Sequence, residues 1–205
     1  VIECGFLTNR VDYDEDVTKF TDLHQVTEFL PAQRGRKKYV VMLNYGEYDV
    51  DKIPERQEGM IDGIRVAFHK KDLQESMELC RQLKAKGYLV FVQAMVSLCY
   101  TDQEFMDMIE MVNEFEPYAF YIVDSFGMMK QKNLLRLFYM IEHNLKDNIW
   151  IGFHSHNNMQ LAYSNAQALV EVQTNRNLVV DASVYGMGRG AGNLNTELFI
   201  EYLNE

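Results

Sequence analysis

The chain has 205 residues, of which 47% are hydrophobic and 24% charged, with only 12 Gly and 3 Pro. This is ordinary globular composition, and it excludes a disordered, collagen-like or low-complexity chain. Lys and Arg number 20 against 30 Asp and Glu, so the formal net charge is −10. Because such a charge gives no general attraction to phosphate backbones or anionic lipid, we expect neither nucleic acid nor membrane as a partner.

The cysteines and the apolar runs indicate a cytoplasmic location. Cys4, Cys80 and Cys99 are an odd number at wide spacing with no paired motif, which fits reduced thiols rather than a disulfide framework. The most apolar run, residues 88–100, is shorter than the roughly 18 residues that a membrane helix needs. Nothing at the start of the chain has the pattern of a signal peptide.

Taken in chain order, short β-rich runs predict seven strands, with helical periodicity between the later ones. The predicted strands cover residues 1–7, 39–44, 63–68, 88–93, 119–123, 149–153 and 178–182. The predicted helices cover residues 72–86, 101–115, 131–145 and 159–172, and a last helix starts near Thr196. Segments 8–38 and 45–62 are less regular. Alternating strands and helices imply parallel strands joined by right-handed crossovers.

Strand parity decides between an open doubly wound sheet and a closed barrel. In the third predicted strand Ile64, Val66 and Phe68 share one face, and Arg65 and Ala67 share the other. A sheet covered by helices on both sides would be apolar on both faces, whereas a barrel can carry polar inward residues near its carboxyl-terminal mouth. We therefore predict a (β/α)8 TIM barrel with seven of its eight strands present, forming one domain over residues 1–205.

A pair of histidines at the end of the sixth predicted strand is the strongest local signal. His154 and His156 stand at i and i+2, so their side chains leave one face of the strand roughly 6.5 to 7 Å apart along the backbone. That spacing allows both imidazoles to converge on one metal ion. The alternative is a pair of polar residues bonded to neighbouring loops. The carboxyl-terminal position in a barrel favours the metal site.

Three other groups are candidates at the same rim. The Gly-rich run 186–192 lacks the spacing of a dinucleotide-binding loop, but it can bring backbone close to a ligand and deliver Asn193 to the pocket mouth; the alternative is a flexible turn. Asp124 can orient a ligand or a histidine and Ser125 can bond a substrate oxygen, or the two can simply cap a turn. Arg65 suits a substrate carboxylate, or it forms a structural ion pair with Glu3.

Together the motifs of residues 152–158, 161–166 and 180–193 resemble the metal-dependent aldolase, acyltransferase and lyase superfamily. That group includes 4-hydroxy-2-oxovalerate aldolase, hydroxymethylglutaryl-CoA lyase and isopropylmalate synthase, and the resemblance is closest to the aldolase branch. It implies a (β/α)8 barrel whose Mn²⁺ or Mg²⁺ is held by His154 and His156. Asn193 joins them in the lyase branch, and Ser125 corresponds to a residue that contacts the oxoacid.

The resemblance also implies an Arg-Asp pair at the end of the first strand, and this sequence contains no such pair. Residues 1–7 resemble the second strand of the family, so we expect the first β/α unit to be absent from this chain. The chemistry implied is the making or breaking of a carbon–carbon bond next to a pyruvate-type 2-oxoacid, with the ion stabilising an enolate.

Three alternatives to this activity stay open at the level of sequence. One is a barrel that has lost catalysis and serves as a binding or assembly module. The second is an acyltransferase that condenses an acyl-CoA with a 2-oxoacid. A hydrolytic amidohydrolase barrel is disfavoured because its His-x-His pair lies on the first strand. The 12 Met and 12 Tyr supply side chains for a homo-oligomer interface but locate none.

Overall fold

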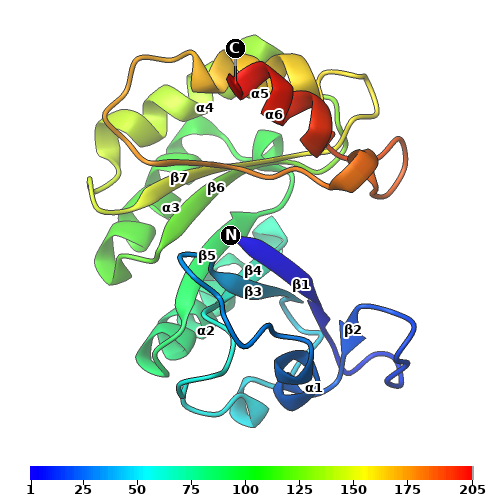
Figure 1. The fold of residues 1–205 in the computed structure, drawn as a ribbon. Coiled ribbons are helices and arrows are strands. Elements are labelled where there is room, and N and C mark those ends of the chain that lie inside the picture. The colour runs from blue at the N-terminus through cyan, green and yellow to red at the C-terminus, as the bar shows by residue number, and fades with distance from the viewer. Residues whose placement is uncertain (205) are drawn as a thin grey trace. The chain divides into compact units, whose positions relative to one another are not determined.

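Runs of β-branched and aromatic residues form the parallel strands of the computed structural model, which describes residues 1–204 (Figure 1). The chain divides into two compact units, Val1–Gln93 and Ala94–Glu205. The parallel strands alternate with helices, as in a TIM-barrel-like fold. The predicted fold class is confirmed, while the prediction of a single domain stays a prediction.

The first unit contains strands β1 to β5 and helices α1 and α2. Their bounds are β1 (Ile2–Leu7), β2 (Lys19–Phe20), α1 (Leu23–Glu28), β3 (Tyr39–Asn44), β4 (Gly63–Phe68), α2 (Leu73–Ala85) and β5 (Leu89–Ala94). The strands lie in the order β2-β1-β3-β4-β5. Val40, Val41 and Leu43 of β3 and Ile64 and Val66 of β4 are fully buried. The core of this unit therefore lies on the central strands.

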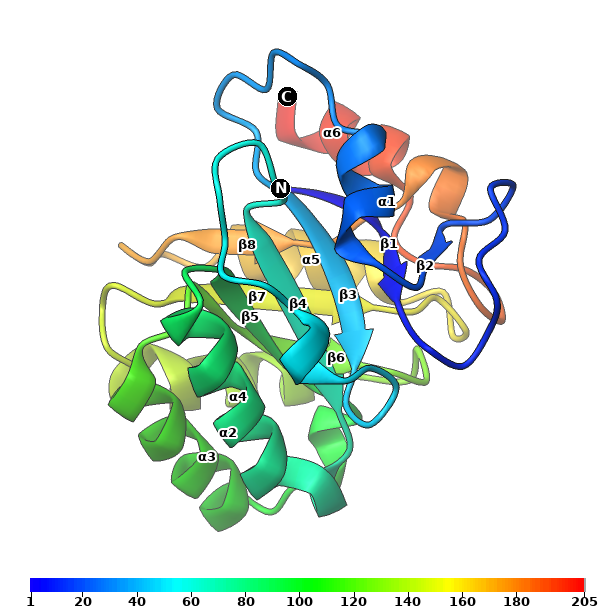
Figure 2. The same cartoon turned by 90° about the horizontal axis from the view of Figure 1, so that it is seen from below.

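In the second unit the helices lie against strands β6, β7 and β8, which are neighbours in this order in the sheet. Its elements are α3 (Asp102–Phe115), β6 (Ala119–Asp124), α4 (Gln131–Asn144), β7 (Trp150–Ser155), α5 (Ala162–Val170), β8 (Leu178–Val180) and α6 (Thr196–Asn204). Figure 1 shows α4, α5 and α6 on one side of these strands, and Figure 2 shows α3 and α4 side by side. The apolar faces of α3 and α4 are buried, which makes a helix-on-sheet core.

The structure adds an eighth described strand to the seven that we predict. Strand β2 falls in segment 8–38 and is only two residues long, so it has no periodicity to detect. It forms because the backbone of Phe6 and Leu7 pairs in parallel with Lys19 and Phe20. The short helix α1 follows in the same irregular segment. Helix α5 also begins later than predicted, at Ala162.

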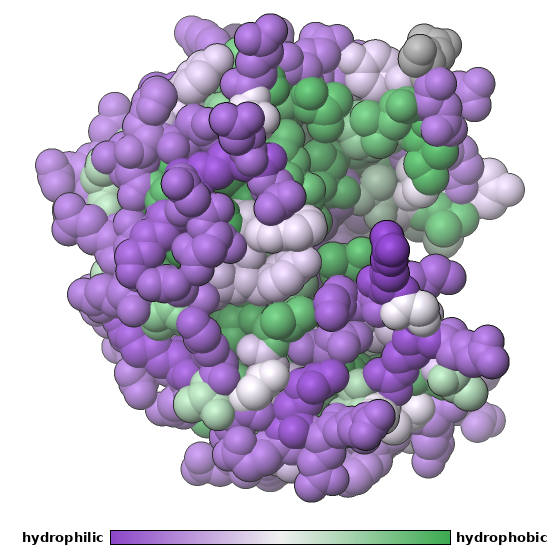
Figure 3. Space-filling model, turned by 60° about the vertical axis from the view of Figure 1, so that its left-hand side comes forward, coloured by the Kyte–Doolittle hydropathy of each residue, from purple (hydrophilic) through white to green (hydrophobic). Residues whose placement is uncertain are grey.

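Hydrophilic side chains cover most of the face drawn in Figure 3, with apolar side chains gathered mainly in its upper part. Helix α6 is one exception to a polar surface, since Leu198, Ile200 and Leu203 are at least half exposed.

Within residues 1–204, no helix combines the length and the apolar character needed to cross a lipid bilayer. Within the described residues, Cys4, Cys80 and Cys99 form no disulfide bond.

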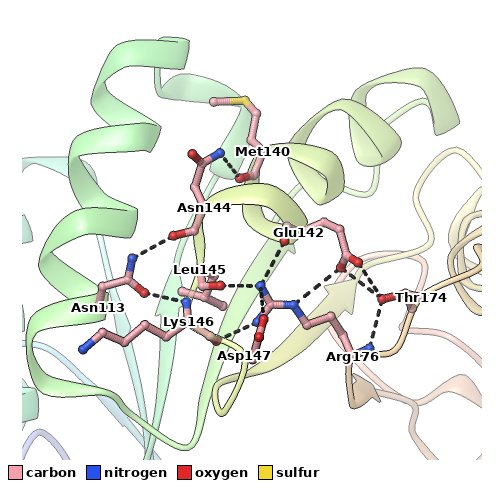
Figure 4. Close-up of polar contacts among 9 residues, drawn as sticks. All are labelled: Asn113, Met140, Glu142, Asn144, Leu145, Lys146, Asp147, Thr174 and Arg176. Atoms are coloured by element: carbon pink, nitrogen blue, oxygen red, sulfur yellow. Dashed lines mark hydrogen bonds and ion pairs between the residues drawn. The ribbon is translucent and has the colours of Figure 1, made fainter.

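The side chain of Arg176, just before β8, is buried against the end of α4 and the segment that leads to β7 (Figure 4). The Arg176 side chain is 6% exposed and donates to the backbone carbonyls of Glu142 (2.9 Å), Leu145 and Lys146 (2.6 Å). Its Nε lies 3.7 Å from the Glu142 carboxylate, which also accepts from Thr174. Arg176 thus satisfies carbonyl groups at the end of α4 that the helix leaves without partners.

Replacing this arginine should destabilise the protein strongly. Arg176→Ala removes the donor to the backbone carbonyls of Glu142 and Leu145, whose hydrogen bonds are part-buried, so we expect the free energy of unfolding to fall by about 2 to 4 kcal/mol. The free energy of unfolding of Arg176→Lys should lie between those of the parent and the alanine variant, because an ammonium group cannot reproduce the guanidinium fork. The measurement is unfolding in urea.

The matched control is Arg136→Ala, on α4, the helix whose end Arg176 contacts. Arg136 is 40% exposed and pairs with an exposed Asp102, so its loss should cost less than about 1 kcal/mol. Equal effects of Arg176→Ala and Arg136→Ala would contradict the role given to Arg176.

Candidate metal and oxoacid site

The site lies where β6, β7 and β8 end in the second unit. In the parallel register Val123 lies opposite His154 and Asp124 opposite Ser155, so the turn after β6 meets the histidine motif. The alternation of β7 sends His154 and His156 to one face, while Ser155 between them is buried. The predicted metal and substrate residues of this unit thus lie at the carboxyl-terminal ends of these strands.

The two imidazoles face one another at the end of β7. Their ring centroids are 5.2 Å apart and the ring planes are nearly perpendicular, at 85°. His154 Nδ1 is 3.0 Å from Asp181 Oδ2, and His156 Nδ1 is 3.3 Å from the backbone oxygen of Asp124. Because a carboxylate and a carbonyl only accept, each contact places a hydrogen on Nδ1, and in the neutral ring Nε2 then keeps its lone pair. In their neutral form both rings therefore have the tautomer that can bind a metal through Nε2.

The environment of His156 favours the neutral form of its ring. Burial lowers the pKa of His156, and repulsion from His154 lowers it further. The backbone oxygen of Asp124 acts in the opposite direction but is the smaller influence. A neutral imidazole is the form that ligates a metal, since a protonated ring has no lone pair to offer.

Asn193 supplies an unsatisfied oxygen beside this pair. Its backbone forms an isolated antiparallel bridge with His156, and Leu194 next to it is buried among side chains of α5 and α6. Asn193 Nδ2 donates to the backbone oxygen of Met187 (2.9 Å), whereas Oδ1 is buried with no hydrogen-bond partner. A buried acceptor without a protein partner is commonly satisfied by a water molecule or an ion. Imidazole nitrogens and an amide oxygen are donor types that divalent cations accept.

No acidic side chain completes the set within the described part of the chain. Residues 1–204 contain no group of three or more His, Cys, Asp or Glu side chains placed to hold one ion. The candidate ligands His154, His156 and Asn193 therefore include no carboxylate. Such a set offers the ion little compensation for its lost hydration.

Asp124 and Ser125 serve the turn that follows β6. The Asp124 carboxylate accepts from the backbone N–H groups of Met128 (3.0 Å) and Met129 (2.9 Å), which is the capping role weighed for it from the sequence. Ser125 Oγ accepts from the N–H of Val96 at 2.9 Å. Val96 has φ 53° and ψ 55°, a left-handed conformation that is strained for a β-branched residue.

A small apolar pocket opens beside Ser125. Its volume is about 240 Å³, and its lining residues are Val96, Leu98, Cys99, Val123, Asp124, Ser125, Phe126 and Met128. Phe126 and Met128 are more than half exposed, so part of this wall faces solvent. The serine hydroxyl is thus a polar group at the edge of an apolar cavity, an arrangement that suits a small organic molecule.

Arg65 lies in the first unit, on β4. It is 6% exposed and forms an ion pair with Glu3 at 2.6 Å. Gln93, with its amide oxygen turned toward the guanidinium, accepts from Arg65 Nε at 2.7 Å. The ion pair weighed from the sequence is present, and a role for Arg65 in substrate binding stays a prediction.

Two residues of the site were not assigned from the sequence. Asp181 follows β8 and contacts His154, and Tyr121 of β6 donates to Asp181 Oδ1 at 3.3 Å. The signal for Asp181 is its parity, which puts it on the polar face. The signal for Tyr121 is Gly152, its partner in the β6–β7 register, because a Cβ at Gly152 would collide with the Tyr121 ring.

Gly127 explains how the turn after β6 docks against the histidine motif. It has φ +59°, and a Cβ there would lie 2.8 Å from the backbone oxygen of His156. Only glycine permits both the left-handed conformation and this close approach. The backbone N–H of Met159 donates to the Gly127 oxygen at 2.9 Å, which closes the contact between the two segments.

The family follows from comparison with known proteins. The HMGL-like family model matches residues 63–205, and the chain belongs to this family, as the resemblance predicted. The 4-hydroxy-2-oxovalerate aldolase 2 of Comamonas testosteroni is 26% identical over 180 residues, which are 88% of this chain and 50% of that protein. The Stutzerimonas stutzeri aldolase of the same name is 29% identical, covering 86% and 51%. The chain spans about half the length of these curated relatives.

Solved structures show the same fold. The N-terminal domain of a predicted aldolase from Bacteroides vulgatus matches with a TM-score of 0.74 and 24% identity, covering 99% of this chain and 67% of that one. The HMG-CoA lyase of Brucella melitensis matches at 0.68 and 17% identity, covering 88% and 70%. Pyruvate carboxylase from Rhizobium etli matches at 0.65 and 16% identity, covering 81% and 18%.

The close packing of Gly152 against Tyr121 predicts how substitutions at these two positions change the stability of the protein. Gly152→Ala forces the Tyr121 ring to move, so we expect the free energy of unfolding to fall by about 1 to 3 kcal/mol. Tyr121→Leu removes the ring, and in its presence Gly152→Ala should cost clearly less. Urea unfolding of the two single variants and the double variant measures the coupling. Additive effects of the two substitutions would contradict this packing.

Proposed function

We propose that this protein is a divalent-metal-dependent aldolase or lyase that makes or breaks a carbon–carbon bond next to the carbonyl of a 2-oxoacid. The observation that carries the proposal is the pair of facing imidazole rings, each with Nδ1 against an acceptor, together with Asn193, whose backbone bridges to His156 and whose Oδ1 is buried without a hydrogen-bond partner among residues 1–204. Membership of the HMGL-like family supports it, as do relatives that are 4-hydroxy-2-oxovalerate aldolases.

His154, His156 and Asn193 are the residues we propose as metal ligands. Their neutral nitrogen and oxygen donors suit Mn²⁺ or Mg²⁺ with positions left open for substrate oxygens. When bound, the ion would supply positive charge that offsets the negative charge developing on the oxoacid. Neutral ligands leave that charge undiminished, at the expense of tight binding.

Ser125, Asp124 and Arg65 are proposed to act on the substrate or on the loop that meets it. The Ser125 hydroxyl would donate to an oxoacid oxygen from the edge of the apolar pocket, which would take the hydrocarbon part and exclude water. Asp124 would keep Ser125 in place by fixing the turn through Met128 and Met129. The guanidinium of Arg65 would bind a carboxylate in its planar fork.

A second candidate function is a barrel that binds a ligand without catalysis. The observation that favours it is the lack of an acidic member in the ligand set of residues 1–204. An acyltransferase that joins an acyl-CoA to a 2-oxoacid would use the same ligands, but the names of the relatives at 24–29% identity favour an aldolase. The experiments below separate catalysis from binding.

Calorimetric titration with Mn²⁺ tests the ligands. The parent protein should bind one ion weakly, and His154→Ala and His156→Ala should each weaken binding at least about tenfold, because each removes a ligand. His143→Ala is the matched control, since His143 lies exposed on α4, away from the site. Equal binding by all four proteins would exclude this pair as the metal site.

Hydrogen exchange at the methyl group of pyruvate tests catalysis without knowledge of the second substrate. Proton NMR in D₂O with the protein and Mn²⁺ should show exchange above the buffer rate, abolished by a chelator and by the double variant His154→Ala with His156→Ala. Ser125→Ala should slow it, because the oxoacid loses a hydrogen-bond donor. Folded, Mn²⁺-binding protein that gives no exchange would favour the binding module.

A further inference from the structure

We propose that Asp181 and Tyr121 are positioning residues that hold His154 in the one tautomer able to bind a cation. This inference deepens the proposed function and rests on it. It concerns side chains that neither the family nor the relatives' names assign, and it follows from the contacts of three residues on three neighbouring strands of the second unit.

The first step is the placement of Asp181 by its own backbone. Directly after β8, its N–H donates to the oxygen of Phe153 on β7 at 2.9 Å, which continues the pairing of the two strands by one residue. This bond sets the carboxylate beside His154, with Oδ2 3.0 Å from Nδ1. An ionised carboxylate accepts only, so the His154 hydrogen stays on Nδ1 and the lone pair on Nε2.

The second step is the support that Tyr121 gives to the other carboxylate oxygen. Tyr121 is fully buried on β6, and its hydroxyl donates to Asp181 Oδ1 at 3.3 Å. Its ring occupies the space that the missing Cβ of Gly152 leaves open. Asp181 is thus held at both oxygens, by His154 at one and by Tyr121 at the other. The orientation of His154 is set before any ion arrives.

The third step is the contrast with His156. Its Nδ1 faces the backbone oxygen of Asp124 at 3.3 Å, so its tautomer depends on the main chain and on no side chain. The two rings therefore reach the same state by different means. A substitution at Asp181 can release His154 and leave His156 unchanged, which makes His156 an internal control in the same molecule.

The direct test reads the two tautomers in the metal-free protein. Long-range proton–nitrogen correlation NMR with ¹⁵N-labelled histidine distinguishes protonated from unprotonated ring nitrogens. We expect both rings of the parent protein to carry hydrogen on Nδ1. In Asp181→Ala, His154 should move its hydrogen largely to Nε2, while His156 keeps the parent pattern and reports that the site is still folded.

Titration with Mn²⁺ then measures the consequence. Asp181→Ala should raise the Kd by about 10- to 100-fold, the range found for residues that orient metal-bound histidines. Tyr121→Phe keeps Asp181 and should leave the His154 tautomer as in the parent, with a smaller increase in Kd. A merely structural role for Asp181 would change stability and leave the tautomer where it was.

Two results would overturn the inference. One is a parent protein in which His154 carries its hydrogen on Nε2, a measurement that needs no variant and so decides the matter even if Asp181→Ala fails to fold. The other is a folded Asp181→Ala protein with the parent tautomer and the parent Kd. A tautomer shift in a protein whose parent form binds no Mn²⁺ would support the positioning role and exclude the metal function.

Discussion

A histidine can bind a cation through Nε2 only when its hydrogen lies on Nδ1, and two histidines can share one ion only when both meet this condition on the same face. The end of β7 meets both demands, because the period of a strand sets the face and two acceptors set the hydrogens. Those acceptors, the Asp181 carboxylate and the Asp124 carbonyl, come from the strands on either side. The site therefore depends on the register of β6, β7 and β8, while Arg176 joins the segments that precede β7 and β8.

The elements that could be predicted from sequence are those whose pattern is local. Strands β3 and β4 have the predicted bounds, because their apolar residues cluster between polar segments. Strand β2 was missed, since two residues have no period and only pairing with β1 defines them. Helix α1 was missed although Asp22 and Gln25 form a capping box, a signal present in the sequence. Arg176 donates to backbone carbonyl groups that lie about 30 residues earlier in the chain. Such contacts cannot be predicted from the spacing of side chains in the sequence.

In the candidate site, too, the residues that could be predicted are those with a local sequence pattern. The histidine pair could be predicted because its spacing is i and i+2 on one strand, and Asn193 because it follows a Gly-rich loop at the same rim. The sequence allowed two interpretations of Asp124, as a residue that orients a ligand or a histidine and as one that caps a turn. In the structure its carboxylate caps the turn after β6. The partnership of Asp181 with His154 depends on which strands are neighbours and on their register, so the parity of Asp181 alone could not reveal it. In the proposed metal site a ligand set without a carboxylate would bind the ion weakly, so binding would depend on each imidazole being oriented beforehand.

Pulsed electron paramagnetic resonance of the Mn²⁺-loaded protein tests the central claim most directly, since it detects the ligand nitrogens themselves. Two imidazole nitrogens should couple to the electron spin of the ion. His154→Ala should leave the coupling from His156 alone, and His143→Ala on the exposed face of α4 should leave both. A bound ion without nitrogen coupling, or with coupling unchanged in His154→Ala, would contradict the assignment of this pair as the metal site.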